Sequence, residues 1–401
     1  MSARSGACPA GLVRLLLALS ASEFGDKLVQ VAYALIAVRT GSTTFLAAVL
    51  AAQTVPVLVL TPLVSSRGWI RSRTAWRAGL IGQVAAFAVA ATAAGDRRVV
   101  LAGVLVAASC EALTMPFSRS LLHALSDGRQ AELARWWAVS KAGAGALGMV
   151  SAGVVVGFSG PGPAFALDAL TFLLVLAVAW SPRIPEDGAP LHRSATAGFR
   201  RLLSPGAFGA LGLLCVSTML LTTSLEGVSG PFMLARTPGY DADGLGVVLA
   251  CWAVASMVTA AATPKRLTGV RLLLPLANVL VALALGLPSL GLPFWTAAAT
   301  FALGGIGNGV FNLLLTRVIW SGVPAGAQPH AWAAFNWILN ASLFLSFTTG
   351  FFVPARHTPA LLAGVSAVCL LVGCLHLSRY WRAPPHRRGR SPEPGRRHRC
   401  G

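Results

Sequence analysis

Apolar windows of about 20 residues recur along the whole chain, and this length is what a helix needs to cross the hydrocarbon core of a membrane. Open sheets are excluded there, because unpaired backbone groups are too costly in lipid. We therefore predict an all-α integral membrane protein with twelve transmembrane helices in two six-helix halves. The windows lie near residues 12–36, 43–63, 76–94, 99–119, 136–157, 164–181, 207–232, 244–262, 271–288, 294–315, 331–352 and 359–378.

Composition agrees with a membrane protein. Hydrophobic residues make up 55% of the 401 residues and charged residues only 11%, whereas a soluble domain is about 25% charged. The net charge is +19. Nucleic-acid-binding proteins carry such a basic surplus on a water-soluble scaffold, so we expect no nucleic-acid partner.

The longest polar interruption before the C-terminus divides the windows six and six. We expect an N-terminal half over 1–181, a cytoplasmic central loop over 182–205, a C-terminal half over 206–378 and a disordered basic tail over 379–401. The first apolar segment runs on to Val38, which favours an uncleaved first helix over a signal peptide.

The basic residues predict the topology. With the N-terminus placed in the cytoplasm and the loops assigned alternately, 25 of the 32 Lys and Arg residues fall on the cytoplasmic side. The five on the other side are Arg39, Arg97, Arg98, Arg236 and Arg356. The positive-inside rule therefore predicts that both termini are cytoplasmic. We expect the protein to lie in the plasma membrane. The tail is expected to contact anionic membrane lipids.

No residue pattern points to an enzyme, a metal or a cofactor. The seven cysteines have no metal-ligand spacing, and the histidines are scattered over helix ends and loops on both sides. No nucleotide-binding loop of the form GxxxxGK[ST] is present, so we expect an ion gradient rather than ATP to supply the energy.

Charged residues inside the membrane cost about 2.5–3.5 kcal/mol each on insertion scales, so each one needs a reason. Glu23, Asp26, Lys27 and Gln30 lie on one face of the first helix. One interpretation is a coupling or substrate site in which a carboxylate takes and releases a proton. The other is an internal ion pair of Lys27 with Glu23 or Asp26 that only fixes the packing.

Further ionisable residues occur in three other predicted helices. Glu111 in the fourth and Lys141 in the fifth are expected either to pair with each other or to bind protons or substrate. Lys141 is also close enough to the cytoplasmic end to extend toward water. Asp168, near the outer end of the sixth helix, is expected to act as a cap or in helix packing.

Glu226 in the seventh helix shares a face with Thr218, Thr222 and Ser229, which favours a cavity lining over an interhelical contact. Asparagine pairs in the tenth and eleventh helices are expected to form interhelical hydrogen bonds; they are Asn308 with Asn312 and Asn336 with Asn340. Two runs of glycines are expected to permit close helix contact, and they are Gly143, Gly145, Gly148 and Gly153, and Gly304, Gly305, Gly307 and Gly309.

Several short segments resemble the major facilitator superfamily, in particular its drug-efflux branch that includes macrolide exporters. They are Phe24-Gly25-Asp26, the stretch from Ala51 to Pro56, Pro116 with the stretch from Ser120 to Leu125, and the run from Gly157 to Phe172. The resemblance implies gating or packing roles for Arg67, Arg71 and Arg73 between helices two and three, and for Gly148 and Gly153 in helix five. The chain departs from the family where that loop lacks an acidic residue and where Met149, not proline, follows Gly148.

Together these features predict a monomeric secondary transporter that exports small hydrophobic or amphipathic molecules by alternating access. A proton gradient, rather than ATP, is expected to drive the export. The candidate coupling or binding residues are Glu23, Asp26, Gln30, Glu111, Lys141 and Glu226. The alternatives are an importer with the same fold, and a membrane partner or sensor that transports nothing.

Overall fold

The computed structural model describes residues 10–67, 73–125, 130–181, 200, 202–203, 208–236, 242–263, 270–322 and 328–382. This part of the chain contains twelve long α-helices and two short 3-10 helices. The long helices are α1 (Ala10–Arg39), α2 (Thr43–Arg67), α3 (Arg73–Thr92), α4 (Arg97–Leu125), α5 (Gln130–Ser159), α6 (Gly162–Ala179), α8 (Gly209–Leu234), α9 (Ala242–Ala262), α10 (Val270–Gly286), α11 (Phe294–Gly322), α12 (Gln328–Phe352) and α13 (Thr358–Arg382). The short ones are η2 (Leu287–Leu290) and η4 (Ala355–His357).

Each predicted apolar window overlaps one long helix, with ends that differ by at most seven residues where a helix extends beyond the apolar stretch. Ten of the helices are long and apolar enough to cross a membrane. The middle of α1 carries Glu23, Asp26 and Lys27, and this is why its apolar character is interrupted. The apolar part of α12 over which side chains are described is shorter, Trp337–Phe352. These helices indicate a multi-pass membrane protein.

The short break between α10 and α11 shows how a turn separates two membrane-length helices. Helix η2 begins with a proline in its first turn and ends at Gly291, whose φ of +79° lies in the left-handed region that favours glycine. This turn separates the apolar windows predicted over 271–288 and 294–315, and it lets α11 begin at Phe294.

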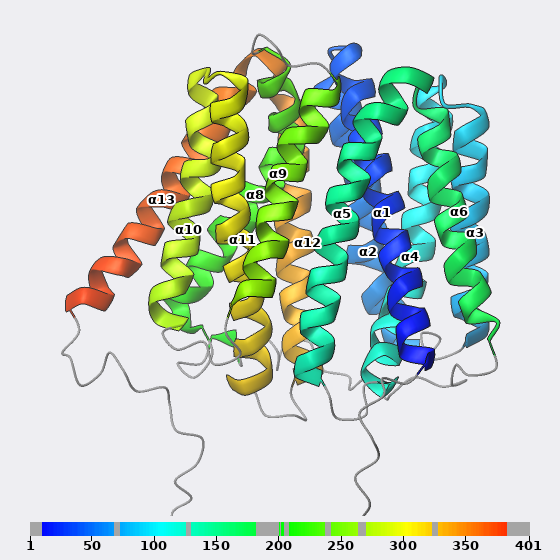
Figure 1. The fold of residues 1–401 in the computed structure, drawn as a ribbon, viewed down its shortest axis with the longest axis horizontal. Helices are drawn as coiled ribbons and strands as arrows, with labels where there is room; N and C mark the ends of the chain where they lie inside the picture. The colour runs from blue at the N-terminus through cyan, green and yellow to red at the C-terminus, as the bar shows by residue number, and fades with distance from the viewer. Residues whose placement is uncertain are drawn as a thin grey trace, which may run out of the picture.

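The helices pack in a pattern that repeats six helices later. In the first group, α1 packs against α5 and α6, α3 against α4 and α6, and α2 against α4. In the second group, α8 packs against α12 and α13, α10 against α11 and α13, and α9 against α11. The two groups lie side by side and meet where α5 packs on α9 and α2 packs on α12 (Figure 1). Such repeats are typical of transporter folds.

Aromatic side chains fill the interior of each group. In the first group, the rings of Trp76 and Phe117 lie 5.2 Å apart, and Phe87 stacks on Phe172 at 5.7 Å. In the second, Trp252 meets Phe301 edge-on at 6.1 Å. These contacts tie α3 to α4 and α6, and α9 to α11, within the groups.

Candidate functional site

Two glycines allow helix α1 to lie deep between α5 and α6. A Cβ atom on Gly25 would overlap the Asp168 carboxylate of α6, and one on Gly148 of α5 would overlap the backbone carbonyl of Phe24. The small residue predicted in helix five thus lies at a close helix contact, and Gly25 provides the matching contact on α1. This placement brings the polar face of α1 next to charged groups of its neighbours.

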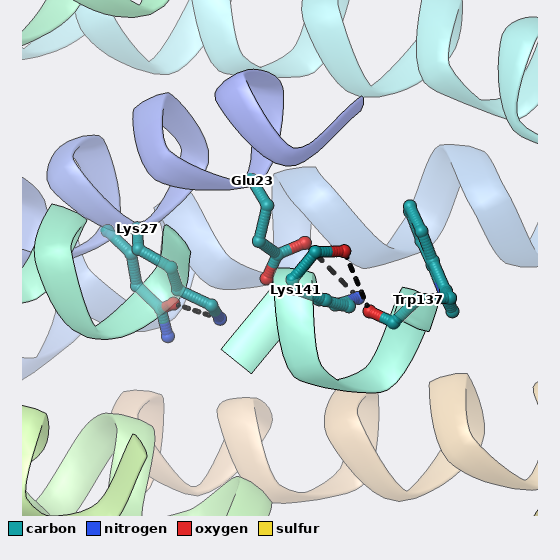
Figure 2. Close-up of polar contacts among 6 residues, drawn as sticks. Glu23, Lys27, Trp137 and Lys141 are labelled. Carbon is teal, nitrogen blue, oxygen red and sulfur yellow. Dashed lines mark hydrogen bonds and ion pairs between the residues drawn. The ribbon is translucent and has the colours of Figure 1, made fainter. Parts of the chain in front are cut away.

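Glu23 pairs with Lys141. The Lys141 Nζ lies 3.2 Å from a Glu23 carboxylate oxygen, with side chains 45% and 13% exposed, and the two extend toward each other from α5 and α1 (Figure 2). The ammonium also lies 6.0 Å from the ring centroid of Trp137. Pairing of Lys141 with Glu111 was one expected arrangement, but α5 packs against α1 rather than beside α4.

Lys27 does not form the expected ion pair within α1. Its Nζ donates a hydrogen bond of 2.8 Å to the Gln30 side-chain oxygen, one turn along the helix (Figure 2). Lys27 also lies within electrostatic reach of Glu226 on α8, in the second group of helices. Lys27 is therefore placed between the two groups, and not in a local pair with Glu23 or Asp26.

Like Glu111, Asp26 is an exposed carboxylate of the site. Its side chain is exposed although it lies in the middle of α1, and among the described residues it has no hydrogen bond or ion pair. It lies within electrostatic reach of Glu23, Glu111 and Asp168, and of Lys27. The candidate residues predicted on separate helices are thus gathered around one position on α1.

Glu226 reaches this cluster, but the polar stripe predicted around it divides. Its half-buried carboxylate lies against Gly230 of its own helix. Thr218 instead receives a hydrogen bond from Asn278 of α10, at 3.5 Å. Thr222 and Ser229 have no exposed surface. The stripe therefore does not line one continuous cavity, because the threonines face the packed contact with α10 and α13.

Asp168 is not a helix cap. The N-cap of α6 is Pro161, and Asp168 lies in the second turn with no exposed surface. The Thr171 hydroxyl lies 3.2 Å from one carboxylate oxygen, while the other is buried and has no hydrogen-bond partner. The side chain packs against α1 at Gly25.

Tyr33 is a residue that the sequence reasoning missed. Its side chain is fully buried, its hydroxyl has no hydrogen-bond partner, and its ring lies 5.6 Å from that of Phe165. The hydroxyl lies within electrostatic reach of Asp168 and Asp26. One signal was available: Tyr33 follows Asp26 by seven residues, or two helical turns, and so lies on the same face of α1.

The arginines at the start of α3 bind the end of α6. Arg73 donates to the backbone carbonyls of Ala179, at 2.8 Å, and of Ser181. Arg77 donates to the Ala179 carbonyl at 3.2 Å and lies over the Trp180 ring at 4.1 Å. Both arginines therefore complement the negative end of the α6 dipole within one group of helices.

Some predicted features lie outside the described residues, namely Arg71, the Arg67 side chain, the Asn336 side chain, most of the central loop and the basic tail from 383. Other packing predictions have a described counterpart. The Asn308 amide donates to Ser256 of α9 at 3.4 Å. Gly153 of α5 lies near Gly246 of α9, where the two groups meet. Among the described side chains, no group of three His, Cys, Asp or Glu residues is placed to hold a metal ion.

No protein-family model matches the chain, and no curated protein matches it in sequence. Solved structures do match in fold. A mutant of the nucleoside transporter NupG aligns with a TM-score of 0.70 at 13% identity, covering 91% of this chain and 98% of that one. Another NupG structure gives 0.64 at 13% identity, covering 94% and 100%. A POT family transporter in complex with a thioalcohol-conjugated peptide gives 0.68 at 11% identity, covering 92% and 96%. The chain therefore shares its fold with these membrane transporters.

Proposed function

We propose that this protein is a secondary active transporter of the plasma membrane that exports small hydrophobic or amphipathic molecules in exchange for protons. In this proposal all twelve long helices span the membrane. The groups α1–α6 and α8–α13 form two halves that rock against each other around a central site, as in alternating access.

The observation that carries the proposal is the cluster of ionisable side chains around α1, which Glu226 of the second group approaches through Lys27. Charged groups at membrane depth are costly, and they typically mark substrate or ion pathways. Here they come from five helices: Glu23, Asp26 and Lys27 of α1, Glu111 of α4, Lys141 of α5, Asp168 of α6 and Glu226 of α8. Such a cluster is not needed to hold a purely structural bundle together.

The chemistry of the cluster favours a cationic or proton-carrying substrate. It contains five carboxyl groups and two lysines, and Glu23 forms an ion pair with Lys141 at 3.2 Å. The Lys27 ammonium interacts electrostatically with one carboxylate in each group of helices. These are Asp26 on its own helix and Glu226 on α8. Protonation of Glu226, or substrate binding to it, changes its attraction to Lys27 and so the attraction between the halves.

The arrangement of the helix ends supports the proposed topology. The start of α1 and the end of α13 lie at the same end of the bundle (Figure 1). In the proposal this end is cytoplasmic, and the basic tail beyond it contacts anionic lipids.

The test is accumulation of ethidium, a hydrophobic cation, in cells that express the protein. We expect lower accumulation than in cells without it, and loss of the difference when a protonophore collapses the proton gradient. Glu226→Gln and Glu23→Gln should reduce export, because each removes a charge of the cluster. Glu132→Gln, in the exposed first turn of α5, is the matched control.

Two results would count against the proposal. Raised accumulation of a nucleoside or a dipeptide, with no effect on ethidium, would indicate an importer. Unchanged accumulation over a broad panel of compounds, with the protein correctly inserted, would indicate a partner or sensor without transport activity.

A further inference from the structure

Asp168 occupies an environment that does not suit a negative charge. Its side chain has no exposed surface, one carboxylate oxygen is bonded only by Thr171, and the other has no hydrogen-bond partner. An isolated ionised carboxylate in such a dry site is so unfavourable that the group takes up a proton instead.

Among the described residues, no lysine or arginine forms an ion pair with Asp168. Helix α6 packs against α1, α3 and α5. The charged and titratable groups that these helices and α4 bring toward it are Glu23, Asp26, Lys27 and Tyr33 of α1, Lys141 of α5 and Glu111 of α4. On α3, Arg73 and Arg77 bind the far end of α6, and Gln83 is uncharged. Lys141 forms an ion pair with Glu23, and Lys27 donates a hydrogen bond to Gln30.

Two exposed carboxyl groups, Asp26 and Glu111, lie within electrostatic reach of Asp168, and Asp26 is the one whose chain neighbour packs against it. Asp168 packs over Gly25, which is next to Asp26 in the chain, and the two carboxyl groups lie within electrostatic reach of each other. Asp26 is exposed and Asp168 is dry. Two carboxyl groups so placed tend to share one proton.

We propose that Asp168 is a second proton-binding group of the coupling site, which stores the proton that Asp26 exchanges with water. In the loading step the O–H bond on Asp26 breaks and one forms on Asp168, so the negative charge moves to the exposed carboxylate. The reverse transfer releases the proton. The buried Tyr33 hydroxyl has no hydrogen-bond partner and lies within electrostatic reach of both carboxyl groups. This inference rests on the proposed proton-coupled transport.

The first test needs no substrate. Infrared spectra of the purified full-length protein at neutral pH should contain the carbonyl stretch of a protonated carboxylic acid, and Asp168→Asn should remove that component. Thr171→Val keeps the carboxyl group and should only shift the band, which guards against misfolding of the first variant. Asp96→Asn, on the exposed connection between α3 and α4, should leave the band unchanged. An unchanged band in Asp168→Asn overturns the inference.

The second test uses ethidium in membrane vesicles that contain the protein. Asp168→Asn should lower gradient-driven ethidium transport by at least about tenfold, as for other lost proton-transfer groups, while downhill equilibration of ethidium continues. Loss of the infrared band with gradient-driven transport intact would overturn the coupling role. If the wild-type protein moves no ethidium at all, the proposed function fails, and the infrared test still decides whether Asp168 holds a proton.

Discussion

The charged side chains of the site differ in how much water reaches them, and this difference sets the effect of each substitution. Lys141 is 45% exposed in its pair with Glu23, so water screens much of the attraction. Exposed ion pairs contribute roughly 0–1 kcal/mol to stability. Polar contacts between helices that are buried, such as that of Asn278, are expected to contribute more to the free energy of unfolding than this exposed pair.

We expect Lys141→Gln to change the free energy of unfolding by less than about 1 kcal/mol, because the pair is partly exposed, but to reduce ethidium export. Combining Glu23→Lys with Lys141→Glu should restore part of the export, since the pair is then reversed. Thermal unfolding and export, both measured on the same preparations, check this. A large loss of stability in Lys141→Gln that accounts for the loss of export would show that the pair is structural.

Asn278 forms a buried contact between α10 and α13. Its amide donates to the Cys369 carbonyl at 2.9 Å, and its side-chain oxygen lies 3.2 Å from the Cys369 sulfur. Asn278→Ala should lower the stability by about 1–2 kcal/mol, as for strong interhelical hydrogen bonds in membranes. Asn308→Ala removes only a 3.4 Å bond to Ser256 and should cost less. Thermal unfolding in detergent compares them, and a reversed order would contradict the assignment.

At the scale of the elements, close backbone approach and helix-end contacts decide how α1, α3 and α6 sit together. Gly25 admits the Asp168 side chain against α1. Arg73 and Arg77 hold the end of α6 from the start of α3. A larger residue than Gly25, or a shorter one than Arg73 or Arg77, is therefore expected to shift α6 as a whole.

Gly25→Ala should destabilise the protein by about 1–3 kcal/mol, the usual cost of overpacking, because its methyl group would overlap the Asp168 carboxylate. Gly364→Ala in α13 is the matched control, since a Cβ there meets nothing within 4 Å. The control should be neutral or stabilising, because alanine favours helices. Equal melting temperatures for the two variants would show that α1 and α6 do not pack this closely.

Arg73→Ala removes hydrogen bonds to the Ala179 carbonyl at the end of α6 and to the Ser181 carbonyl just beyond it. We expect a loss of about 1–2 kcal/mol, since bonds from charged donors contribute more than neutral ones. Arg98→Ala, at an exposed position of α4, is the control and should have little effect. Proteolysis near the end of α6 and thermal unfolding measure the change; matching values for the two variants would remove the proposed anchor.

At the scale of the whole molecule, the two groups of helices touch through small residues. A Cβ on Gly350 of α12 would lie 2.8 Å from the Cβ of Ala47 on α2. Gly246 of α9 similarly approaches the Met149 backbone of α5. If transport requires the groups to separate here, fixing one of these contacts should stop it.

The double variant Ala47→Cys, Gly350→Cys tests this motion, since its Cβ atoms need to move apart by only about 1 Å to reach disulfide geometry. Under oxidising conditions we expect transport to stop, and dithiothreitol should restore it. The two single-cysteine variants are the controls. Full transport by the cross-linked protein would rule out rocking at the α2–α12 contact.

The sequence by itself determined the helices, since the membrane demands about 20 apolar residues for each span and this requirement is local. It also marked Glu23, Asp26, Glu111, Lys141 and Glu226 as exceptional, because charge at that depth is costly wherever it occurs. The helices and the set of candidate residues were therefore predictable without any knowledge of their contacts.

Only the tertiary structure decided which of these groups meet. Helix α5 packs against α1 and not beside α4, so Lys141 pairs with Glu23. Asp168 is buried against Gly25 instead of capping α6. Tyr33 gains its role from neighbours on another helix. Partners of this kind depend on which helix faces come together, and that is fixed by close packing over the whole bundle rather than by the spacing of residues along one helix.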